Sequence, residues 1–363
     1  MSRNDSEERA PGKNGPGIVI RQAGPERARE VLELLRGAAE WMRENGLTQW
    51  KPEQFTEAGV ASYFAEREVY VAEDEGKAAG VFTLQFSDPE YWGRRNDPRY
   101  AYLHRLAVGQ AYRGGGLGAA MLQYAADLAR HRGCLGLRLD TVANNVKLNR
   151  YYQTRGFRLM GMNEISGGKK VNLYERLPEQ AGANGIGVRF FAPDDFEAFT
   201  RWTEPPEFLK QWAGPCFQHP VTASALSAYL EGANHTVESD KLVFSVFLRQ
   251  TGETVGHFRL AAIDRDNGSA RIGTVVMDEA CRGRGIGRRI IAEAQRIGFE
   301  VLELHRLSLG VFDFNRQARA TYEAAGFRTE GCQREAALFG ESYVDLIEMG
   351  ILDREWKERS ENN

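Results

Sequence analysis

The sequence predicts an α/β protein, in the α+β sense, made of two tandem domains. Each domain is expected to hold a mixed, mostly antiparallel sheet with helices on both faces. The chain length of 363 residues suits two domains of ordinary size. Two motifs recur in the same order about 170 positions apart, and strand-type and helix-type patterns follow one another in the same order in both halves.

The repeat is carried by two motifs. Residues 113–118 read RGGGLG and residues 282–287 read RGRGIG, with their last glycines 169 positions apart. The second motif is an Asn, then a Tyr, then a Gly-Phe pair, found at Asn145, Tyr152, Gly156 and Phe157 and again at Asn315, Tyr322, Gly326 and Phe327. Chance does not explain two motifs in the same order at nearly the same separation.

Between the two copies lies a Gly- and Ala-rich segment, residues 179–186, which we predict to be a linker. Residues 1–16 are polar and lack the apolar stretch of a signal peptide, so they are expected to form a disordered tail. The predicted domains are therefore residues 17–178 and 187–360.

In the first half, a strand at 17–22 precedes a helix at 25–45, whose apolar residues recur with helical spacing. The helix at 116–132 is stopped by Gly133. The other predicted strands are 69–73, 78–86, 101–108, 135–142, 157–162 and 171–177, and a further helix is expected at 146–155.

The second half follows the same order. A hairpin is expected at Asp266-Asn-Gly268, because this pair of residues suits a tight turn. Predicted strands are 188–191, 242–249, 254–263, 270–277, 307–312, 327–333 and 343–352, with helices at 285–300 and 316–325.

Composition excludes several classes of protein. The formal net charge is −3, with 47 Lys plus Arg against 50 Asp plus Glu, so the basic excess of a nucleic-acid-binding protein is missing. No apolar run is long enough to span a membrane. The 4 cysteines show no CxxC spacing, so we expect neither a metal site nor a disulfide framework, and a reducing cytoplasm fits.

In each half a strand leads through an Arg/Gly loop into a helix. Helix N-termini leave backbone N–H groups unpaired, and glycine lets a ligand approach them closely, so such a loop can bind phosphate or pyrophosphate. One alternative is that the glycines only make a tight turn. Another is a dinucleotide site, since Gly114, Gly116 and Ala119 match that fingerprint and Asp140 follows about twenty residues later. Two features count against a dinucleotide site. Five residues separate Val108 from Gly114, too many for the usual tight turn, and the second copy has Arg288 where a small residue is needed.

With both motifs in place, the sequence resembles the GNAT superfamily of N-acetyltransferases over nearly all of residues 17–356. The resemblance implies a sheet whose fourth and fifth strands splay apart, with acetyl-CoA in the opening. Its pyrophosphate would lie on the loops, and its pantetheine arm along the fourth strand. The cofactor-binding residues so implied are Leu106, Val108, Arg113, Gly114, Gly115, Gly116, Gly118 and Asn145, and in the second copy Val275, Met277, Arg282, Gly283, Arg284, Gly285, Gly287 and Asn315.

The implied acceptor is a primary amine, on a small molecule or on a protein. The amine must lose a proton, the thioester carbonyl develops an oxyanion that a backbone N–H can stabilise, and the CoA thiolate needs a proton. Tyr152 and Tyr322 are the candidate proton donors. The run around His104 resembles arylalkylamine acetyltransferases, where a His at the matching position serves the amine; a His hydrogen-bonded within the sheet is the alternative.

The second half departs from this pattern, because residues 271–277 contain no acid or His. Its closing segments resemble ribosomal-protein acetyltransferases, and Glu335 or Asp345 is a candidate base, with ion pairing as the alternative role. The leading hypothesis is a tandem acetyl-CoA-dependent N-acetyltransferase that works by direct attack in a ternary complex. In the alternative, one half, the C-terminal one first, is a non-catalytic acyl-CoA-binding module. The chain is expected to be a monomer in which the halves pair, or a homodimer.

Overall fold

The structure is a computed structural model that describes residues 17–177 and 185–361. The predicted tail at 1–16 and most of the predicted linker lie outside the described residues. Proximity of Cα atoms divides the described chain into an N-terminal unit, within 1–142 and 163–180, and a C-terminal unit, within 143–162 and 181–363. The segment 143–162, part of the first repeat in sequence, groups with the C-terminal unit.

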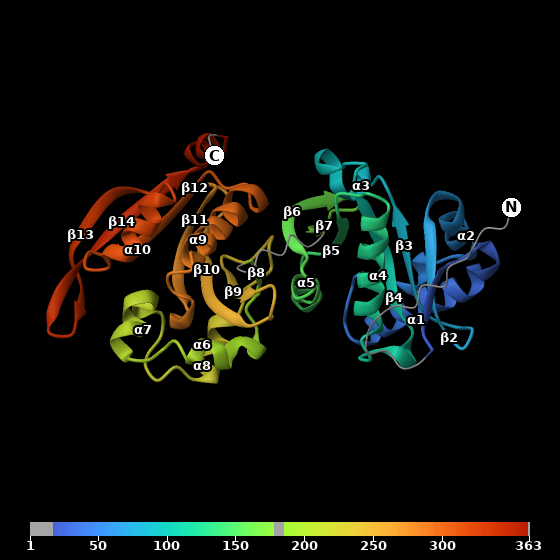
Figure 1. Cartoon of the computed structure of the whole chain (residues 1–363), viewed down its shortest axis with the longest axis horizontal. Coiled ribbons are helices and arrows are strands. Elements are labelled where there is room, and N and C mark those ends of the chain that lie inside the picture. Colours follow the sequence, from blue (N-terminus) through green and yellow to red (C-terminus); the bar gives the residue numbers. More distant parts are fainter. Residues whose placement is uncertain (1–16, 178–184, 362–363) are drawn as a thin grey trace. The chain divides into compact units, whose positions relative to one another are not determined.

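The first repeat forms one seven-stranded sheet with the order β1-β2-β3-β4-β5-β7-β6 (Figure 1). Its strands are β1 (Val19–Gln22), β2 (Glu68–Asp74), β3 (Lys77–Gln85), β4 (Ala101–Val108), β5 (Leu137–Val142), β6 (Arg158–Ile165) and β7 (Lys169–Arg176). Its helices are α1 (Ala28–Glu44), α2 (Glu57–Glu66), α3 (Pro89–Trp92), α4 (Leu117–His131) and α5 (Val146–Gln153).

The second repeat forms a seven-stranded sheet of the same topology, in the order β13-β14-β12-β11-β10-β9-β8. Its strands are β8 (Ile186–Phe190), β9 (Leu242–Leu248), β10 (Thr254–Asp264), β11 (Ser269–Met277), β12 (Arg306–Phe312), β13 (Arg328–Phe339) and β14 (Ser342–Leu352). Its helices are α6 (Phe196–Thr200), α7 (Pro206–Ala213), α8 (Ala223–Leu230), α9 (Ile286–Arg296), α10 (Arg316–Ala324) and α11 (Asp353–Glu361).

The fourth and fifth strands of each sheet run parallel and stay paired over only three residues. In the first sheet Ala101–Leu103 pair with residues 137–139, and in the second residues 269–271 pair with residues 306–308. The neighbouring pairs, such as β2 with β3 and β3 with β4, are antiparallel. These pairings confirm the predicted mixed, mostly antiparallel sheets and the opening between the fourth and fifth strands.

A β-bulge lies in the fourth strand of each sheet. In β4 the register shifts against β3 and Arg105 has a φ of 54°; in β11 the register shifts against β10 and Thr274 has a φ of 48°. A bulge inserts an extra residue, bends the strand and turns the backbone that follows. Both fourth strands therefore change direction close to the point where they leave the fifth strand.

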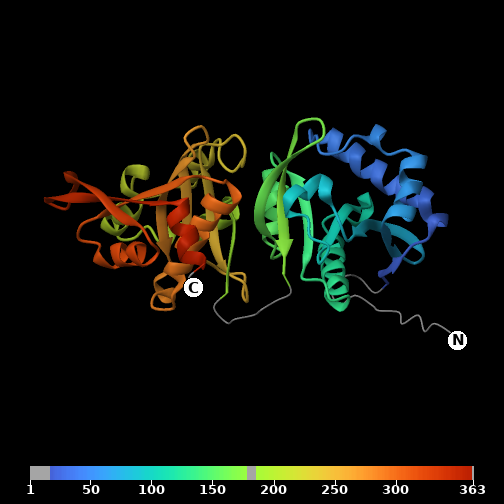
Figure 2. The same cartoon turned by 90° about the horizontal axis from the view of Figure 1, so that it is seen from above.

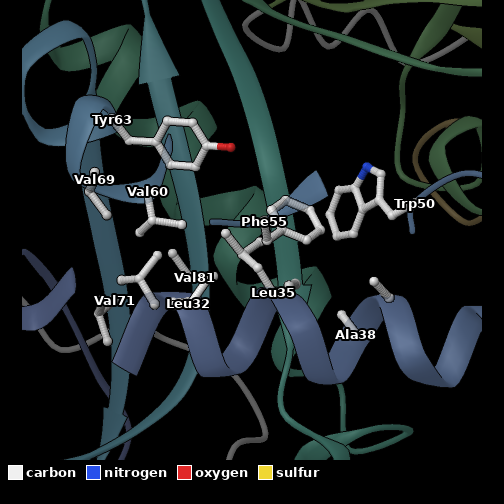
Figure 3. Close-up of a cluster of buried hydrophobic side chains, with 13 residues drawn as sticks. Leu32, Leu35, Ala38, Trp50, Phe55, Val60, Tyr63, Val69, Val71 and Val81 are labelled. Atoms are coloured by element: carbon white, nitrogen blue, oxygen red, sulfur yellow. The ribbon is translucent and has the colours of Figure 1, made fainter. Parts of the chain in front are cut away.

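One face of the first sheet is covered by α1 and α2. Figure 3 shows Leu32 and Leu35 of α1 facing Val71 and Val81 of the sheet, with Val60 of α2 packed beside them. Leu35, Val60 and Val81 have no exposed surface. Full burial of one such side chain stabilises the fold by about 1.5–3 kcal/mol.

Helix α4 covers the opposite face of the sheet. Alternate residues of each strand point to this face and pack against the helix. Tyr70 of β2 stacks on Phe82 of β3 with ring centroids 5.0 Å apart, and both rings contact Tyr124 of α4, at 6.1 and 6.4 Å. In Figure 2, α1 and α2 lie on one side of this sheet and α4 lies on the other. The predicted arrangement of helices on both faces is confirmed here.

In the second sheet, β13 and β14 form a long hairpin that projects from the rest of its unit (Figures 1 and 2). Strand β13 extends to Phe339, beyond the predicted end at residue 333. The pairing of β13 with β14 resumes beyond a bulge at Glu335 (φ 53°). There the carboxylate of Asp345 accepts a 2.8 Å hydrogen bond from the Glu335 N–H. Across the described parts of both units, no helix combines the length and the hydropathy that crossing a membrane requires.

Candidate active site

The two glycine loops have the same backbone conformation. Gly114 and Gly116 have φ values of 77° and 88°, and Gly283 and Gly285 have values of 73° and 75°. Side chains other than glycine rarely adopt this left-handed region. Gly116 and Gly285 are the N-cap residues of α4 and α9, and among the described residues no side chain caps either helix. Each helix therefore begins with backbone N–H groups that no described side chain caps, the kind of terminus at which anions can bind.

Arg113 and Arg282 brace these loops. The Arg113 guanidinium lies 4.6 Å from the ring centroid of Trp41, and its Nε donates a hydrogen bond to the Val108 carbonyl at 3.3 Å. The Arg282 guanidinium lies 5.4 Å from the ring centroid of Phe208 and pairs with Glu279. Burial lowers the pKa of Arg113. Stacking and hydrogen bonding hold the two guanidinium groups against helices α1 and α7.

The predicted pantetheine-binding residues lie in the part of each fourth strand that has left the fifth. Leu106 and Val108 are partly exposed and flank buried Ala107, and Val275 and Met277 flank buried Val276 in the same way. Alternation along a strand puts each flanking pair on the same face. The sheet therefore presents these side chains together beside the opening.

Asn145 and Asn315 are N-cap residues of α5 and α10. The side-chain oxygen of Asn145 accepts a hydrogen bond from the Leu148 N–H at 3.0 Å, and that of Asn315 accepts one from the Ala318 N–H at 3.2 Å. An Asn in this position satisfies a backbone donor that the helix leaves unpaired. The structure thus gives both residues a part in starting the helices that carry the two tyrosines.

Tyr152 and Tyr322 lie near the ends of α5 and α10. The Tyr152 ring packs edge-on against Phe157, with centroids 5.8 Å apart, and Tyr322 makes the same kind of contact with Phe327 at 6.3 Å. Burial raises the pKa of Tyr322 to about 12, so its phenol stays protonated at neutral pH. The Tyr and Phe of the repeated motif are therefore packing partners.

A buried cluster of Asp88, His104 and Asp140 lies where β4 and β5 separate. His104 and Asp140 immediately follow Leu103 and Leu139, the last paired residues of the two strands. His104 Nε2 is 2.9 Å from Asp88 Oδ2, and His104 Nδ1 is 3.6 Å from Asp140 Oδ1. Sequence reasoning identified His104 but not its partners, because Asp88 precedes a short helix and Asp140 lies within a separate strand.

Burial raises the pKa of Asp140 to about 6, with a smaller increase from Asp88 and a decrease from His104. The three side chains also offer ligand atoms within 4.8 Å of one another, a spacing that a metal ion can use. Both imidazole nitrogens of His104, however, already face carboxylates on opposite edges of the ring. His104 thus has a hydrogen bond to Asp88 on one edge of its ring and Asp140 within ion-pair distance on the other.

The described part of the second repeat has no counterpart of this cluster. Counted from the repeated motifs, the positions that match His104 and Asp140 are Gly273 and Gly310. Arg271 fills part of the space: a Cβ added to Gly310 would lie 2.5 Å from its Nη2. Its guanidinium forms a two-pronged ion pair with Glu348, at 2.7 and 3.0 Å. Glu335 and Asp345 lie on the exposed hairpin instead.

The C-terminal unit does contain a buried histidine that the sequence did not single out. His257 Nε2 is 3.2 Å from the Tyr229 hydroxyl, which lies 3.1 Å from the Thr274 hydroxyl at the bulge of β11. Burial lowers the pKa of His257 to about 3, so the ring is neutral at physiological pH. Packing of Phe191 and Phe199 against its ring makes it part of the core.

A sequence model of the acetyltransferase (GNAT) family matches residues 33–157 and again residues 207–327. The chain is 31% identical over 144 residues to the uncharacterized N-acetyltransferase YesJ of Bacillus subtilis (strain 168), covering 38% of this chain and 79% of that protein. It is 32% identical over 107 residues to a spermidine N(1)-acetyltransferase of Vibrio cholerae, covering 30% and 61%.

Among solved structures, spermidine N-acetyltransferase from Vibrio cholerae in complex with CoA and spermine aligns with a TM-score of 0.43 and 21% identity, covering 48% of this chain and 99% of that one. Each range matched by the family contains one glycine loop and ends at the Phe of the second motif, Phe157 or Phe327.

Proposed function

The chain belongs to the acetyltransferase (GNAT) family in both of its halves, and from this premise we propose that it transfers an acetyl group to a primary amine by direct attack within a ternary complex. It is an N-acetyltransferase, and acetyl-CoA is its acyl donor. The first repeat is proposed to carry the reaction. The two acetyltransferase domains are proposed to be residues 17–178 and 187–360. Expressing each range alone would test these boundaries.

We propose that each glycine loop binds the pyrophosphate of one acetyl-CoA. The left-handed glycines and the uncapped N-termini of α4 and α9 support this role. Arg113, Gly114, Gly115, Gly116 and Gly118 would form the first loop, and Arg282, Gly283, Arg284, Gly285 and Gly287 the second. The partly exposed residues of β4 and β11 would line the pantetheine arm, namely Leu106, Val108, Val275 and Met277.

The reaction at the thioester needs groups in three catalytic roles. A backbone N–H of β4 beyond its last pairing with β5 is proposed to stabilise the oxyanion. Tyr152 is proposed to protonate the departing thiolate, with Tyr322 in the same role if the second repeat turns over. His104 and its carboxylate partners are proposed to receive the proton of the amine.

The observation that carries this proposal is the loop itself, repeated with the same glycine conformations after a fourth strand that has left its parallel neighbour. The experiment is CoA release from acetyl-CoA in the presence of a panel of amines. Spermidine heads the panel, because one relative named above is a spermidine N(1)-acetyltransferase, and other primary amines complete it. Release that depends on one of these amines would support the proposal, and no release with any primary amine would contradict it.

A second candidate function is that the second repeat binds acyl-CoA without catalysis. Gly273 and Gly310 stand where the first repeat has His104 and Asp140, and Arg271 occupies the space beside Gly310. Residues 187–360 expressed alone should then bind acetyl-CoA but release no CoA with the amine that the whole chain accepts. Light scattering would decide between a monomer and a homodimer.

A further inference from the structure

The cluster of Asp88, His104 and Asp140 is placed where the reaction is expected. Leu103 and Leu139 form the last parallel pair of β4 and β5, and the two strands separate from there. His104 and Asp140 are the next residues on the two strands and reach each other across the start of the opening, with Nδ1 and Oδ1 3.6 Å apart. A thioester lying in this opening would have both side chains beside its inner end.

His104 is poorly placed to touch an amine itself. Its Nε2 is hydrogen-bonded to Asp88 Oδ2 at 2.9 Å, and its Nδ1 faces Asp140 at 3.6 Å, so Asp140 stands between Nδ1 and an approaching amine. Exposure of the three side chains rises along the chain of contacts, from 3% for Asp88 to 8% for His104 and 13% for Asp140. Asp140 is therefore the end of the cluster that solvent or a substrate reaches first.

From this geometry we infer that Asp140 is the group that takes the proton from the acceptor amine, and that His104 and Asp88 are positioning residues behind it. The inference rests on the proposed function, because it assigns a base to the same reaction. It also replaces the sequence-based expectation that His104 contacts the amine.

The amine arrives as an ammonium ion, and the Asp140 carboxylate removes one proton, which leaves a neutral nitrogen with a free electron pair. His104 Nδ1 then accepts that proton from Asp140 and becomes an imidazolium between two carboxylates. The nitrogen attacks the thioester carbon, the C–S bond breaks, and the nitrogen's second proton balances the one that the thiolate gains. His104 returns its proton to solvent through Asp140.

The surroundings suit this role. The charged and titratable groups that face Asp140 are Asp88, His104 and Arg105, with Lys169 of β7 and Tyr91 of α3. Burial and Asp88 raise the pKa of Asp140, whereas His104, Lys169 and Arg105 lower it, and the result is about 6. A carboxylate with that pKa is mostly ionised at pH 7 and more basic than an ordinary aspartate, as a general base requires.

The test compares Asp140→Asn with wild-type full-length protein, using the amine that gives the fastest CoA release. We expect kcat/KM at pH 7 to fall by about 10²–10⁴-fold, the usual contribution of a general base. The acidic limb of the wild-type pH profile near pH 6 should disappear, and the remaining rate should follow the pKa of the free amine, because only neutral amine can then react.

Asp88→Asn tests the positioning role. Asn keeps the shape and can still accept the hydrogen bond from the Tyr91 N–H that starts α3. Loss of the negative charge should lower the pKa of Asp140 and so move the acidic limb to lower pH, which a purely structural defect would not do. Asp127→Asn, at a partly exposed carboxylate on α4, is the matched control and should leave rate and profile unchanged.

Three results would overturn the inference while wild-type protein remains active. Asp140→Asn could keep the wild-type rate and profile. His104→Gln could abolish the acidic limb while Asp140→Asn retains it, which would make His104 the direct base. The purified protein could hold a stoichiometric divalent metal that Asp140→Asn loses, which would make the cluster a metal site. If wild-type protein releases no CoA with any amine, the proposed function fails instead.

Discussion

At the scale of single residues, Tyr152 and Tyr322 occupy matching positions but stand in different surroundings. Tyr152 belongs to the repeat that has the buried Asp88, His104 and Asp140, whereas the repeat of Tyr322 has glycines at the matching places. A phenol can protonate a thiolate only where the rest of the chemistry takes place. The two tyrosines are therefore expected to differ in importance although their packing is alike.

Replacing Tyr152 by Phe removes the hydroxyl and keeps the ring contact with Phe157. We expect kcat to fall by about 10²-fold or more, because a general acid contributes that much. Tyr322→Phe is the matched control and should leave turnover of the whole chain unchanged. Steady-state CoA release measures both, and an unchanged kcat for Tyr152→Phe in an active preparation would remove it from the mechanism.

Asn145 illustrates a residue whose structural role explains its place in a motif. Asn145→Ala removes the acceptor of the Leu148 N–H, and loss of such a cap costs about 1 kcal/mol of stability. Asn145→Asp keeps an acceptor and should unfold like wild type, as should Ala at the exposed neighbour Asn144. Urea unfolding followed by circular dichroism measures this. An Ala variant of wild-type stability with weakened acetyl-CoA binding would instead make Asn145 a cofactor ligand.

Among helices and strands, the bounds predicted from sequence are most accurate where the hydrophobic pattern and the flanking glycines agree. Strand β4 has the predicted bounds, and α4 begins within one residue of its prediction and ends before Gly133, because its flanking glycines mark the ends. Helices α2, α7 and α8 were not predicted. They have 10, 8 and 8 residues and lie in long connections, where a short apolar pattern does not distinguish helix from loop.

Other features could not be predicted because they arise from pairing between distant segments. The bulges place Arg105 and Thr274 at positive φ, a conformation that neither residue type signals. Asp140 was noticed only as part of a rejected dinucleotide fingerprint. Its meeting with His104 depends on the parallel register of β4 and β5, which brings together residues 36 positions apart in sequence.

The glycine loops make a prediction at this scale. Gly116→Ala forces a residue with a Cβ into a φ of 88°, which costs about 1–2 kcal/mol and shifts the loop, so acetyl-CoA should bind more weakly. Gly133→Ala, at φ 75° beyond the opposite end of α4, carries a similar strain away from the loop and should keep wild-type affinity. Calorimetry with acetyl-CoA compares them. Equal affinity for both variants would mean that the loop does not approach the ligand.

At the scale of the whole molecule, the chain carries the same fold twice with unequal chemistry. Sheet order, bulge, glycine loop and capping Asn are repeated, so the features that build the fold and the cofactor loop are shared. The residues at the opening are not, since His104 and Asp140 have glycines as counterparts. Shared motifs with different side chains at the opening explain why the motifs identified both domains but could not tell which one reacts.

Both repeats are proposed to bind acetyl-CoA through their glycine loops. Isothermal titration of the full chain with acetyl-CoA tests it most directly. We expect two sites per chain, of which Gly116→Ala weakens one and Gly285→Ala the other, while circular dichroism shows both variants folded. A folded wild-type protein that gives no heat of binding, or whose binding neither variant changes, would contradict it.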